Sequence, residues 1–126
     1  VFAGDVTHAT KEILIVSPFM RKNRLTQTIK LLSQVILNGV SVTVVTRPPE
    51  DFKEKERDTV IQNAELLLGH GIHVKYKSEF HQKFTVIDQK VAWYGSVNFL
   101  SYGTHEESIM RFESYDLAGQ LIDTVI

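Results

Sequence analysis

The residues best able to do chemistry form one short pattern in the second half of the chain. His81 is followed two positions later by Lys83, and four residues then separate Lys83 from Asp88. Six further residues lead to the run GSVN at residues 95–98. An imidazole can act as a nucleophile or as an acid–base group, and ammonium, hydroxyl and carboxamide groups can hold phosphate oxygens. The pattern therefore points to attack on a phosphodiester.

The spacing predicts a hairpin that carries this pattern. We expect residues 81–87 and 91–98 to be neighbouring strands, since both are rich in β-branched and aromatic residues. Asp88, Gln89 and Lys90 are the expected turn between them, because Asp favours turns.

Strand alternation then predicts which side chains meet. His81 and Lys83 share one face of the first strand, and Ser96 and Asn98 share one face of the second. A two-residue turn at Asp88 and Gln89 sets His81 opposite Ser96, and moving the turn by one residue sets His81 opposite Asn98. Paired residues project to the same side, so either register gathers the four groups on one patch.

At this point the sequence can be compared with a known signature. The pattern HxK-x4-D-x6-GSxN resembles the HKD motif of the phospholipase D superfamily, and every signature residue is present. The resemblance rests on residues 81–98, and the α/β pattern of the whole chain is compatible with the fold of that superfamily.

The resemblance implies specific catalytic roles for residues of the motif. His81 is the nucleophile that forms a phosphohistidine, and splitting one displacement into two easier steps is the general advantage of covalent catalysis. Lys83 and Asn98 bind the nonbridging phosphate oxygens, and Ser96 supports the site by hydrogen bonding. No metal or other cofactor is required by this chemistry.

Three further residues belong to the implied site. A downstream carboxylate fixes the tautomer of the imidazole, as in a serine-protease triad, and we expect Glu106 in this role with Glu107 as the alternative. Asp88 is expected to be structural, pairing near the turn. Gly95 opens the GSVN run as a structural member of the motif.

The chain carries only one copy of a motif that is needed twice per active site. The other HxK, at His73 and Lys75, is not followed by a GSxN run at the expected distance, and position 80 is Phe80 instead of Asp. We therefore expect a homodimer with the two His81 side chains facing each other. A second motif elsewhere in a longer parent protein is the alternative.

Other residues near the expected site invite weaker predictions. Arg21 and Arg47 follow the first two strands, and ligands bind beyond the carboxyl ends of parallel strands, so both could contact a polyanion. Tyr94 shares a face with Ser96 and could form a wall of the site. A metal cluster of His70 and His73 with His81 is disfavoured, because their spacing does not fix a ligand geometry.

Hydrophobic periodicity predicts the elements that position the motif. Short apolar runs predict strands, and apolar positions at helical spacing predict helices. A helix end is expected at residues 1–10, helices at 24–37, 51–68 and 115–126, and strands at 12–18, 40–46, 72–77, 81–87, 91–98 and 107–112. The order predicts one α/β domain over residues 1–126, with a mixed, mostly parallel sheet and helices on both faces.

Composition narrows the class of protein. The chain has 126 residues, 43% of them hydrophobic and 23% charged, which is typical of a globular domain. It has no cysteine, which excludes thiol catalysis and favours a cytoplasmic protein. No membrane-spanning stretch is expected. The first residue is not Met, so the chain could be a fragment of a longer protein.

The substrate is the least determined part of the prediction. Short single-motif relatives of this kind are nucleases that work as dimers, and residues 95–111 resemble a domain appended to helicases or ATPases. We therefore expect a metal-independent nuclease that acts on DNA more than on RNA, although the net charge of −1 offers no general basic surface. The alternatives are a phospholipid-directed phosphodiesterase and a non-catalytic module for nucleic-acid binding or dimerisation.

Overall fold

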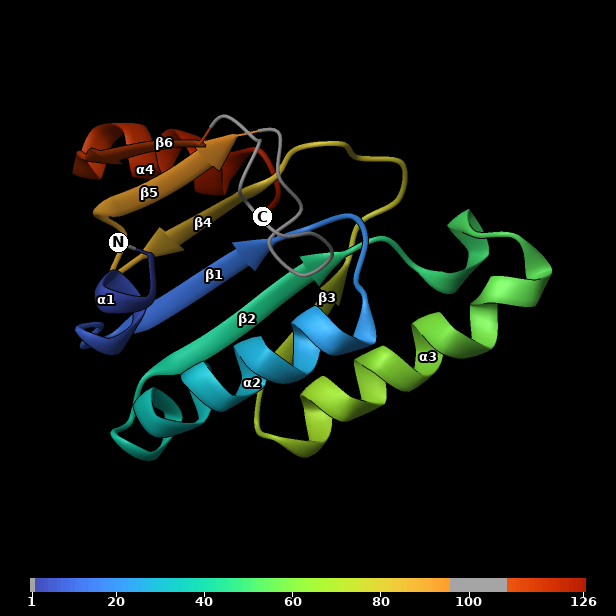
Figure 1. Cartoon of the computed structure of the whole chain (residues 1–126). Coiled ribbons are helices and arrows are strands. Elements are labelled where there is room, and N and C mark those ends of the chain that lie inside the picture. The colour runs from blue at the N-terminus through green and yellow to red at the C-terminus, as the bar shows by residue number, and fades with distance from the viewer. Residues whose placement is uncertain (1, 96–108) are drawn as a thin grey trace.

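A computed structural model describes residues 2–95 and 109–126 of the chain. They form a sheet with the strand order β3-β2-β1-β4-β5-β6 (Figure 1). The strands are β1 (Glu12–Val16), β2 (Ser41–Thr46), β3 (His73–Tyr76), β4 (Phe84–Ile87), β5 (Val91–Gly95) and β6 (Ile109–Glu113).

The mixed α/β sheet that the sequence predicts is confirmed, but the expectation that most strand pairs are parallel is wrong. Strand β1 pairs with β2, and β2 with β3, in parallel. Pairing of β1 with β4, β4 with β5 and β5 with β6 is antiparallel. Antiparallel pairs thus outnumber parallel ones in the described sheet, because β4 enters beside β1 and starts a meander.

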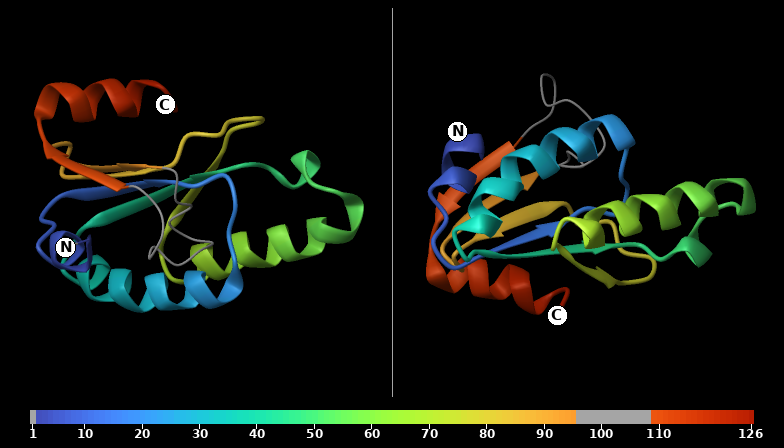
Figure 2. Two further views of the ribbon diagram at one scale, coloured as in Figure 1. Left: turned by 45° about the horizontal axis from the view of Figure 1, so that its top comes forward. Right: turned by 90° about the horizontal axis from the view of Figure 1, so that it is seen from below.

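Helices cover both faces of the sheet. Helices α2 (Lys22–Leu37) and α3 (Glu54–Gly69) lie on one face, and α4 (Tyr115–Asp123) lies on the other (Figure 2). The short helix α1 (Phe2–Thr7) packs against α2. None of the helices described is long and apolar enough to cross a bilayer.

Alternation along β1 divides the core into two layers. Ile13 and Ile15 face α2 and α3 and belong to the larger cluster of buried residues. Leu14 and Val16 face the other way and belong to a second cluster beneath α4. A strand that is apolar on both faces is the one expected at the centre of a sheet covered on both sides.

The expected helix at residues 51–68 is interrupted near its start. A 3-10 turn η1 spans Pro49–Asp51, and α3 begins only at Glu54. Phe52 lies between them in an extended conformation (φ −109°, ψ 161°). This break lets Phe52 pack edge-on against Phe19, with the ring centroids 5.9 Å apart.

Candidate active site

His81 lies in the segment between β3 and β4, and the prediction that it belongs to a strand is wrong. Strand β4 begins at Phe84, which pairs with Val16, the last residue of β1. The chain must cross from the sheet edge at β3 to the middle of the sheet, and residues 81–83 still belong to this crossing. Pro18 follows the end of β1 and has no N–H to extend the pairing.

The crossing segment brings His81 to one particular edge of the sheet. Strands β1, β2 and β3 are parallel and end at this edge, and the antiparallel β4 starts there. The end of β5 lies at the same edge, because β5 is antiparallel to β4. The segment that carries His81 therefore sits where ligands bind in open α/β sheets.

The segment before His81, residues 77–80, is anchored at its first residue, Lys77, and at its last, Phe80. The backbone N–H of Lys77 donates to Thr46 O at 3.0 Å, and Lys77 Nζ donates to Thr124 O at 2.5 Å. Phe80 is only 4% exposed and packs in the cluster beneath α4, which also contains Val125. A buried aromatic ring directly before His81 limits the movement of the backbone that presents it.

Asp51 is the main polar support of the same segment. Its Oδ1 accepts a hydrogen bond from Ser78 Oγ at 2.6 Å, and its Oδ2 accepts one from Glu79 N at 2.7 Å. Arg47 Nε donates to Oδ2 at 2.9 Å. The hydrogen bond from Ser78, the one from Glu79 and the Arg47 guanidinium lower the pKa of Asp51, and they outweigh the opposing effect of burial.

Glu79 has a backbone conformation that needs such support. Its φ is 57°, in the left-handed region that residues with a side chain seldom adopt. The hydrogen bond from its N–H to Asp51 offsets part of the cost of this conformation. The sequence analysis named neither Asp51 nor Glu79 as a site residue. The only local signal for Asp51 was its place in a run of two prolines, Pro48 and Pro49, and two acidic residues after a strand.

The side chain of His81 is exposed, and that of Lys83 is half-buried beside it. Lys83 Nζ donates a hydrogen bond to the backbone carbonyl of His81 at 3.0 Å. The ammonium group is thus held next to the residue whose chemistry it is expected to assist. An exposed imidazole and an ammonium on an anchored segment can meet a phosphodiester that arrives from solvent.

The register of the hairpin differs from both expected alternatives. Ile87 pairs with Val91, so three residues, 88–90, form the turn. Lys83 therefore comes opposite the end of β5, where Gly95 N donates to Lys83 O at 3.4 Å. The turn at Asp88, Gln89 and Lys90 is confirmed, and its three residues set a register between the two alternatives considered. Asp88 and Gln89 both adopt positive φ within it, at 54° and 57°.

Asp88 lies at the other end of β4 from His81. Its Oδ1 accepts hydrogen bonds from the backbone N–H groups of Lys11 at 2.7 Å and Glu12 at 3.0 Å, and its Oδ2 accepts one from Thr10 N at 2.9 Å. Partial burial raises the pKa of Asp88, but these hydrogen bonds lower it overall. Asp88 therefore fastens the hairpin turn to the start of β1.

Several predicted site residues lie outside the described residues. These are Ser96, Asn98 and Glu106, together with the alternative Glu107. The register at the end of β5 fixes only the point from which this part of the chain departs, opposite Lys83.

The three predicted substrate-binding residues have different surroundings. Arg47 stacks over the ring of Phe19, 5.7 Å from its centroid, in addition to its ion pair with Asp51. Tyr94 is 40% exposed and stacks on Phe84, with the centroids 6.2 Å apart. Arg21 is exposed directly before α2. Arg47 thus supports the contacts of Asp51, independently of any role in substrate binding.

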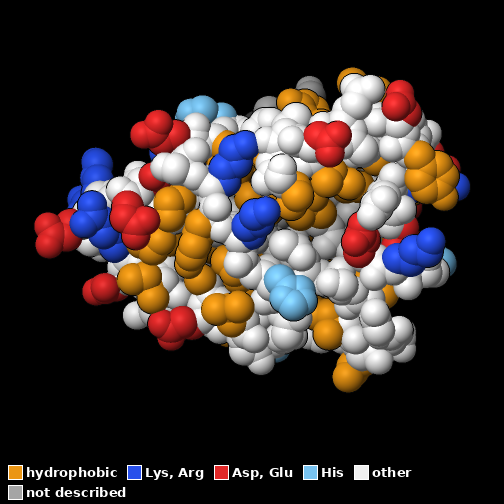
Figure 3. All heavy atoms as spheres, turned by 180° about the vertical axis from the view of Figure 1, so that it is seen from behind, with side chains coloured by type: hydrophobic (Ala, Val, Ile, Leu, Met, Phe, Trp, Pro, Cys, Tyr) orange, Lys and Arg blue, Asp and Glu red, His pale blue; other side chains and the backbone are white. Residues whose placement is uncertain are grey.

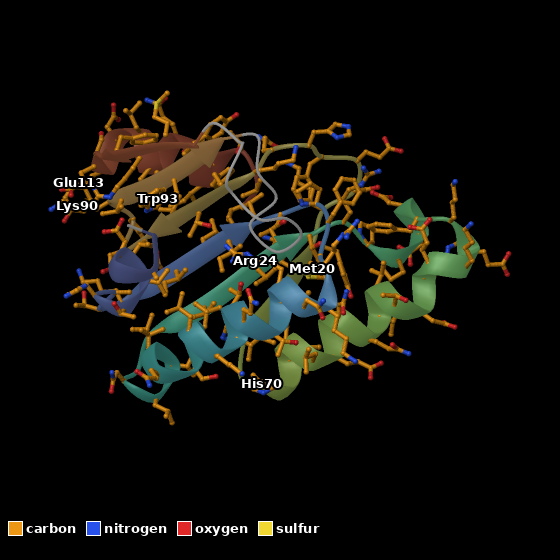
Figure 4. The ribbon with its side chains drawn as sticks, in the orientation of Figure 1. Met20, Arg24, His70, Lys90, Trp93 and Glu113 are labelled. Atoms are coloured by element: carbon orange, nitrogen blue, oxygen red, sulfur yellow. The ribbon has the colours of Figure 1, made fainter. Side chains whose placement is uncertain are left out.

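His70 and His73 lie on other elements than the segment that carries His81. His70 ends α3, where its Nδ1 lies 2.9 Å from Leu66 O (Figure 4), and His73 is exposed on the edge strand β3. Within residues 2–95 and 109–126 no group of three or more His, Asp or Glu residues is arranged to hold a metal ion. Figure 4 also shows Lys90 and Glu113 at the end of the sheet opposite Met20, which precedes α2.

A cavity of about 280 Å³ opens beyond the ends of β1 and β2, near the anchored segment. Phe19, Met20 and Phe52 are among its walls, and Thr46 lies in its lining. Thr46 also accepts the hydrogen bond from Lys77 N through its carbonyl oxygen, so the cavity and the His81 segment share a supporting residue.

Comparison with known proteins shows which of them share this architecture. Residues 4–124 match the family model described as cardiolipin synthase, PLD-like domain. No curated protein matches the chain. Among solved structures, Nuc, a phospholipase D family member from Salmonella typhimurium, is similar with a TM-score of 0.71 and 18% identity, over 97% of this chain and 80% of that one.

Two further structures show the same fold. NucT from Helicobacter pylori has a TM-score of 0.70 and 14% identity, over 98% of this chain and 81% of that one. Phosphatidylserine synthase from Haemophilus influenzae Rd KW20 has a TM-score of 0.72 and 12% identity, over 96% of this chain but only 32% of that one.

Proposed function

The chain belongs to the family of phospholipase D-like domains, and from this premise we propose that it is a metal-independent phosphodiesterase that hydrolyses nucleic acid, DNA more readily than RNA. The observation that carries the proposal is the placement of His81 and Lys83. Both residues lie on an anchored segment at the sheet edge where parallel strands end, with the imidazole exposed.

The proposed reaction has two displacements at phosphorus. In the first, an imidazole nitrogen of His81 forms a bond to phosphorus, the ester P–O bond breaks, and a second histidine protonates the leaving oxygen. In the second, that histidine removes a proton from water, the water oxygen attacks phosphorus, and the P–N bond breaks to return His81. General acid–base help of this kind contributes roughly 10²–10⁴-fold to the rate.

The other motif residues would stabilise charge and orient the nucleophile. Lys83 and Asn98 bind the nonbridging oxygens as negative charge develops on them. Ser96 supports the phosphate site, and Glu106, or alternatively Glu107, holds the imidazole in the tautomer that leaves one nitrogen free to attack.

We propose that the second histidine is His81 of a second copy of the chain. Nuc and NucT support this, because the present fold covers 80% and 81% of their lengths, which leaves little room for a second such unit. The exposure of His81 is what a site shared by two copies requires. Attachment to a helicase or ATPase domain, which could supply a second motif or added affinity, and a cytoplasmic location remain predictions.

The charge distribution constrains how nucleic acid would be held. Lys and Arg side chains on the face shown in Figure 3 are scattered among acidic and hydrophobic ones. With a net charge of −1, the chain has no excess of basic residues to bind phosphates along a long duplex. This surface is better suited to a short contact around the scissile phosphate than to binding along a duplex, unless a partner domain adds affinity.

A phospholipid substrate is the second candidate. It is favoured by the description of the matching family and by the similarity to phosphatidylserine synthase, although the chain spans only 32% of that protein. Hydrolysis of glycerol phospholipids without hydrolysis of DNA or RNA would select it.

The proposal is tested by trapping the covalent intermediate. An acid-labile, base-stable phosphoramidate that still carries one oligonucleotide fragment should appear on the peptide that contains His81 when the chain is quenched during turnover of an oligonucleotide in chelator. Excess His81→Ala chain should also lower the activity of the wild-type chain more than dilution does, because mixed dimers lack one histidine. Turnover without phosphate on His81 would contradict the mechanism.

A further inference from the structure

The cavity beyond β1 and β2 has a buried polar floor. Asn63 is 4% exposed and Thr46 is 1% exposed, and both are among its lining residues. Asn63 Nδ2 donates a long hydrogen bond to Met20 O at 3.5 Å. In the part of the chain that the structure describes, no donor is recorded for Asn63 Oδ1. An acceptor oxygen of a buried residue on the cavity wall favours a ligand that offers a hydrogen-bond donor.

The walls of the cavity are aromatic and apolar. Phe19 and Phe52 meet edge to face, with the centroids 5.9 Å apart, and Met20 and Val60 complete the apolar lining. A planar ring can stack on or against such a pair. The volume of about 280 Å³ lies just below the range of small-molecule pockets, roughly 300–1,000 Å³, and so suits one ring system.

The charges near the cavity argue against other ligands. A cationic lipid headgroup is disfavoured, because the ring of Phe19 already stacks with the Arg47 guanidinium, and Lys55 lies in the lining. An acyl chain is disfavoured as well, since it would leave the Asn63 carbonyl buried without a partner. Glu56 lies beside Lys55, so the rim offers both an acceptor and a donor.

The cavity is joined to the segment that carries His81. Thr46 lines the cavity and accepts a hydrogen bond from Lys77 N at 3.0 Å. Phe19 contacts Arg47, which binds Asp51, and Asp51 in turn holds Ser78 and Glu79. A ligand in the cavity therefore lies against the same framework that positions the nucleophile.

We propose that this cavity binds the base of a nucleotide adjacent to the phosphodiester attacked by His81, a proposal that rests on the function proposed above. Phe19 and Phe52 provide the stacking surface, and Asn63 Oδ1 accepts a hydrogen bond from an amino or imino group of the base. A base held there presents its neighbouring phosphate to the His81 segment, so base binding positions the scissile bond.

The experiment fills the cavity from its rim. Thr59 is exposed on α3 and lines the cavity, whereas Gln62 is exposed on the same helix and does not. Thr59→Tyr is compared with the matched control Gln62→Tyr. The three substrates share the 4-nitrophenol leaving group. Two carry a base, thymidine 5′-(4-nitrophenyl) phosphate and its 3′ isomer, and the third, methyl 4-nitrophenyl phosphate, has none.

We expect Thr59→Tyr to lower the ratio of kcat/KM for the thymidine esters to that for the methyl ester by roughly tenfold, the size of a lost base-stacking contact. Gln62→Tyr should leave the ratio as in the wild type. An unchanged ratio in Thr59→Tyr, or an equal fall in both variants, would overturn the proposal.

A binding measurement separates the failure of this proposal from the failure of the proposed function. Adenosine monophosphate should shift the NMR signals of the Met20, Phe52 and Asn63 amides, and ribose 5-phosphate should not. These shifts in a chain that hydrolyses no diester would reject the nuclease and keep the base site. No shift, equal shifts with both probes, or shifts caused by glycerophosphocholine instead would reject the base site.

Discussion

The Asp51 carboxylate accepts a hydrogen bond from the backbone N–H of Glu79 at 2.7 Å, two residues before His81. Glu79 has a φ of 57°, so this contact holds a strained residue in place. Asp51 is in turn bound by Arg47, and Ser78 Oγ donates to its other oxygen. The position of the proposed nucleophile therefore depends on a carboxylate that is distant in sequence.

The first prediction is that Asp51→Asn impairs catalysis without removing any group that touches substrate. The amide loses part of the acceptor strength that holds Ser78 and Glu79, so we expect kcat to fall roughly tenfold, equivalent to about 1.4 kcal/mol of transition-state stabilisation. Steady-state kinetics check this, and Asp51→Glu should restore part of kcat. Asp58→Asn, an exposed residue of α3, is the control, and a loss of the same size there would contradict a specific role for Asp51.

The second prediction concerns the pH dependence of stability. Hydrogen bonds from Ser78 and Glu79 lower the pKa of Asp51 in the folded state below its usual value of 3.8. A lowered folded pKa stabilises the fold above the unfolded pKa, and this stabilisation is lost as the pH falls through the folded pKa. The difference in unfolding free energy between wild type and Asp51→Asn should thus be largest near neutral pH and shrink below about pH 4. Urea titrations across this range measure it, and a difference independent of pH would refute the explanation.

The third prediction separates Asp88 from the chemistry. Asp88→Ala removes the acceptor for the backbone N–H groups of Thr10, Lys11 and Glu12. We expect the free energy of unfolding to fall by about 2–3 kcal/mol, because charge-assisted hydrogen bonds are lost and donors are left unpaired. Urea denaturation checks this, with Asp123→Ala on the exposed end of α4 as the control.

Catalysis gives the second readout for Asp88. At a temperature where the Asp88→Ala chain is folded, kcat should stay close to wild type, because the residue lies at the far end of β4 from His81. A loss of kcat without a loss of stability would place Asp88 in the chemistry.

The fourth prediction uses the single tryptophan of the chain. Trp93 Nε1 donates to Asp5 Oδ2 at 2.7 Å, and Arg111 binds both oxygens of Asp5 at 2.7 and 3.0 Å. Hydrogen bonding to Arg111 is the largest cause of a lowered pKa of Asp5. Asp5→Asn should loosen α1, lower the unfolding free energy by about 1–2 kcal/mol and shift the Trp93 emission. Emission identical to that of wild type would show that this contact does not hold α1 in solution.

The sequence predicted the elements well wherever burial sets a local pattern. The apolar runs that contain Ile13–Val16 and Val42–Val45 became the central strands, because they are buried on both faces. The buried stripe of α2 follows from Leu25, Ile29 and Leu32 at helical spacing. These features depend on neighbours in sequence, which is why periodicity finds them.

The site was less predictable because long-range topology positions it. The residue types from His81 to Ile87 suggested a strand, but the first three of these residues complete the crossing to the middle of the sheet. The hairpin register follows from a three-residue turn between Ile87 and Val91, and the residue types alone did not fix the number of paired residues. The role of Asp51 arises from a contact with Ser78 over 27 positions, which the local run of two prolines and an acidic pair does not reveal.

The most direct test of the account is the rate of oligonucleotide hydrolysis in chelator by three chains: wild type, His81→Ala and His73→Ala. His73 is the matched control, because it is also exposed and also begins an HxK sequence. We predict that the wild type and His73→Ala hydrolyse the substrate at similar rates and that the rate of His81→Ala falls at least a thousandfold, since removing a catalytic nucleophile can cost up to about 10⁶-fold. Equal rates for wild type and His81→Ala would contradict the central claim that His81 attacks the phosphodiester.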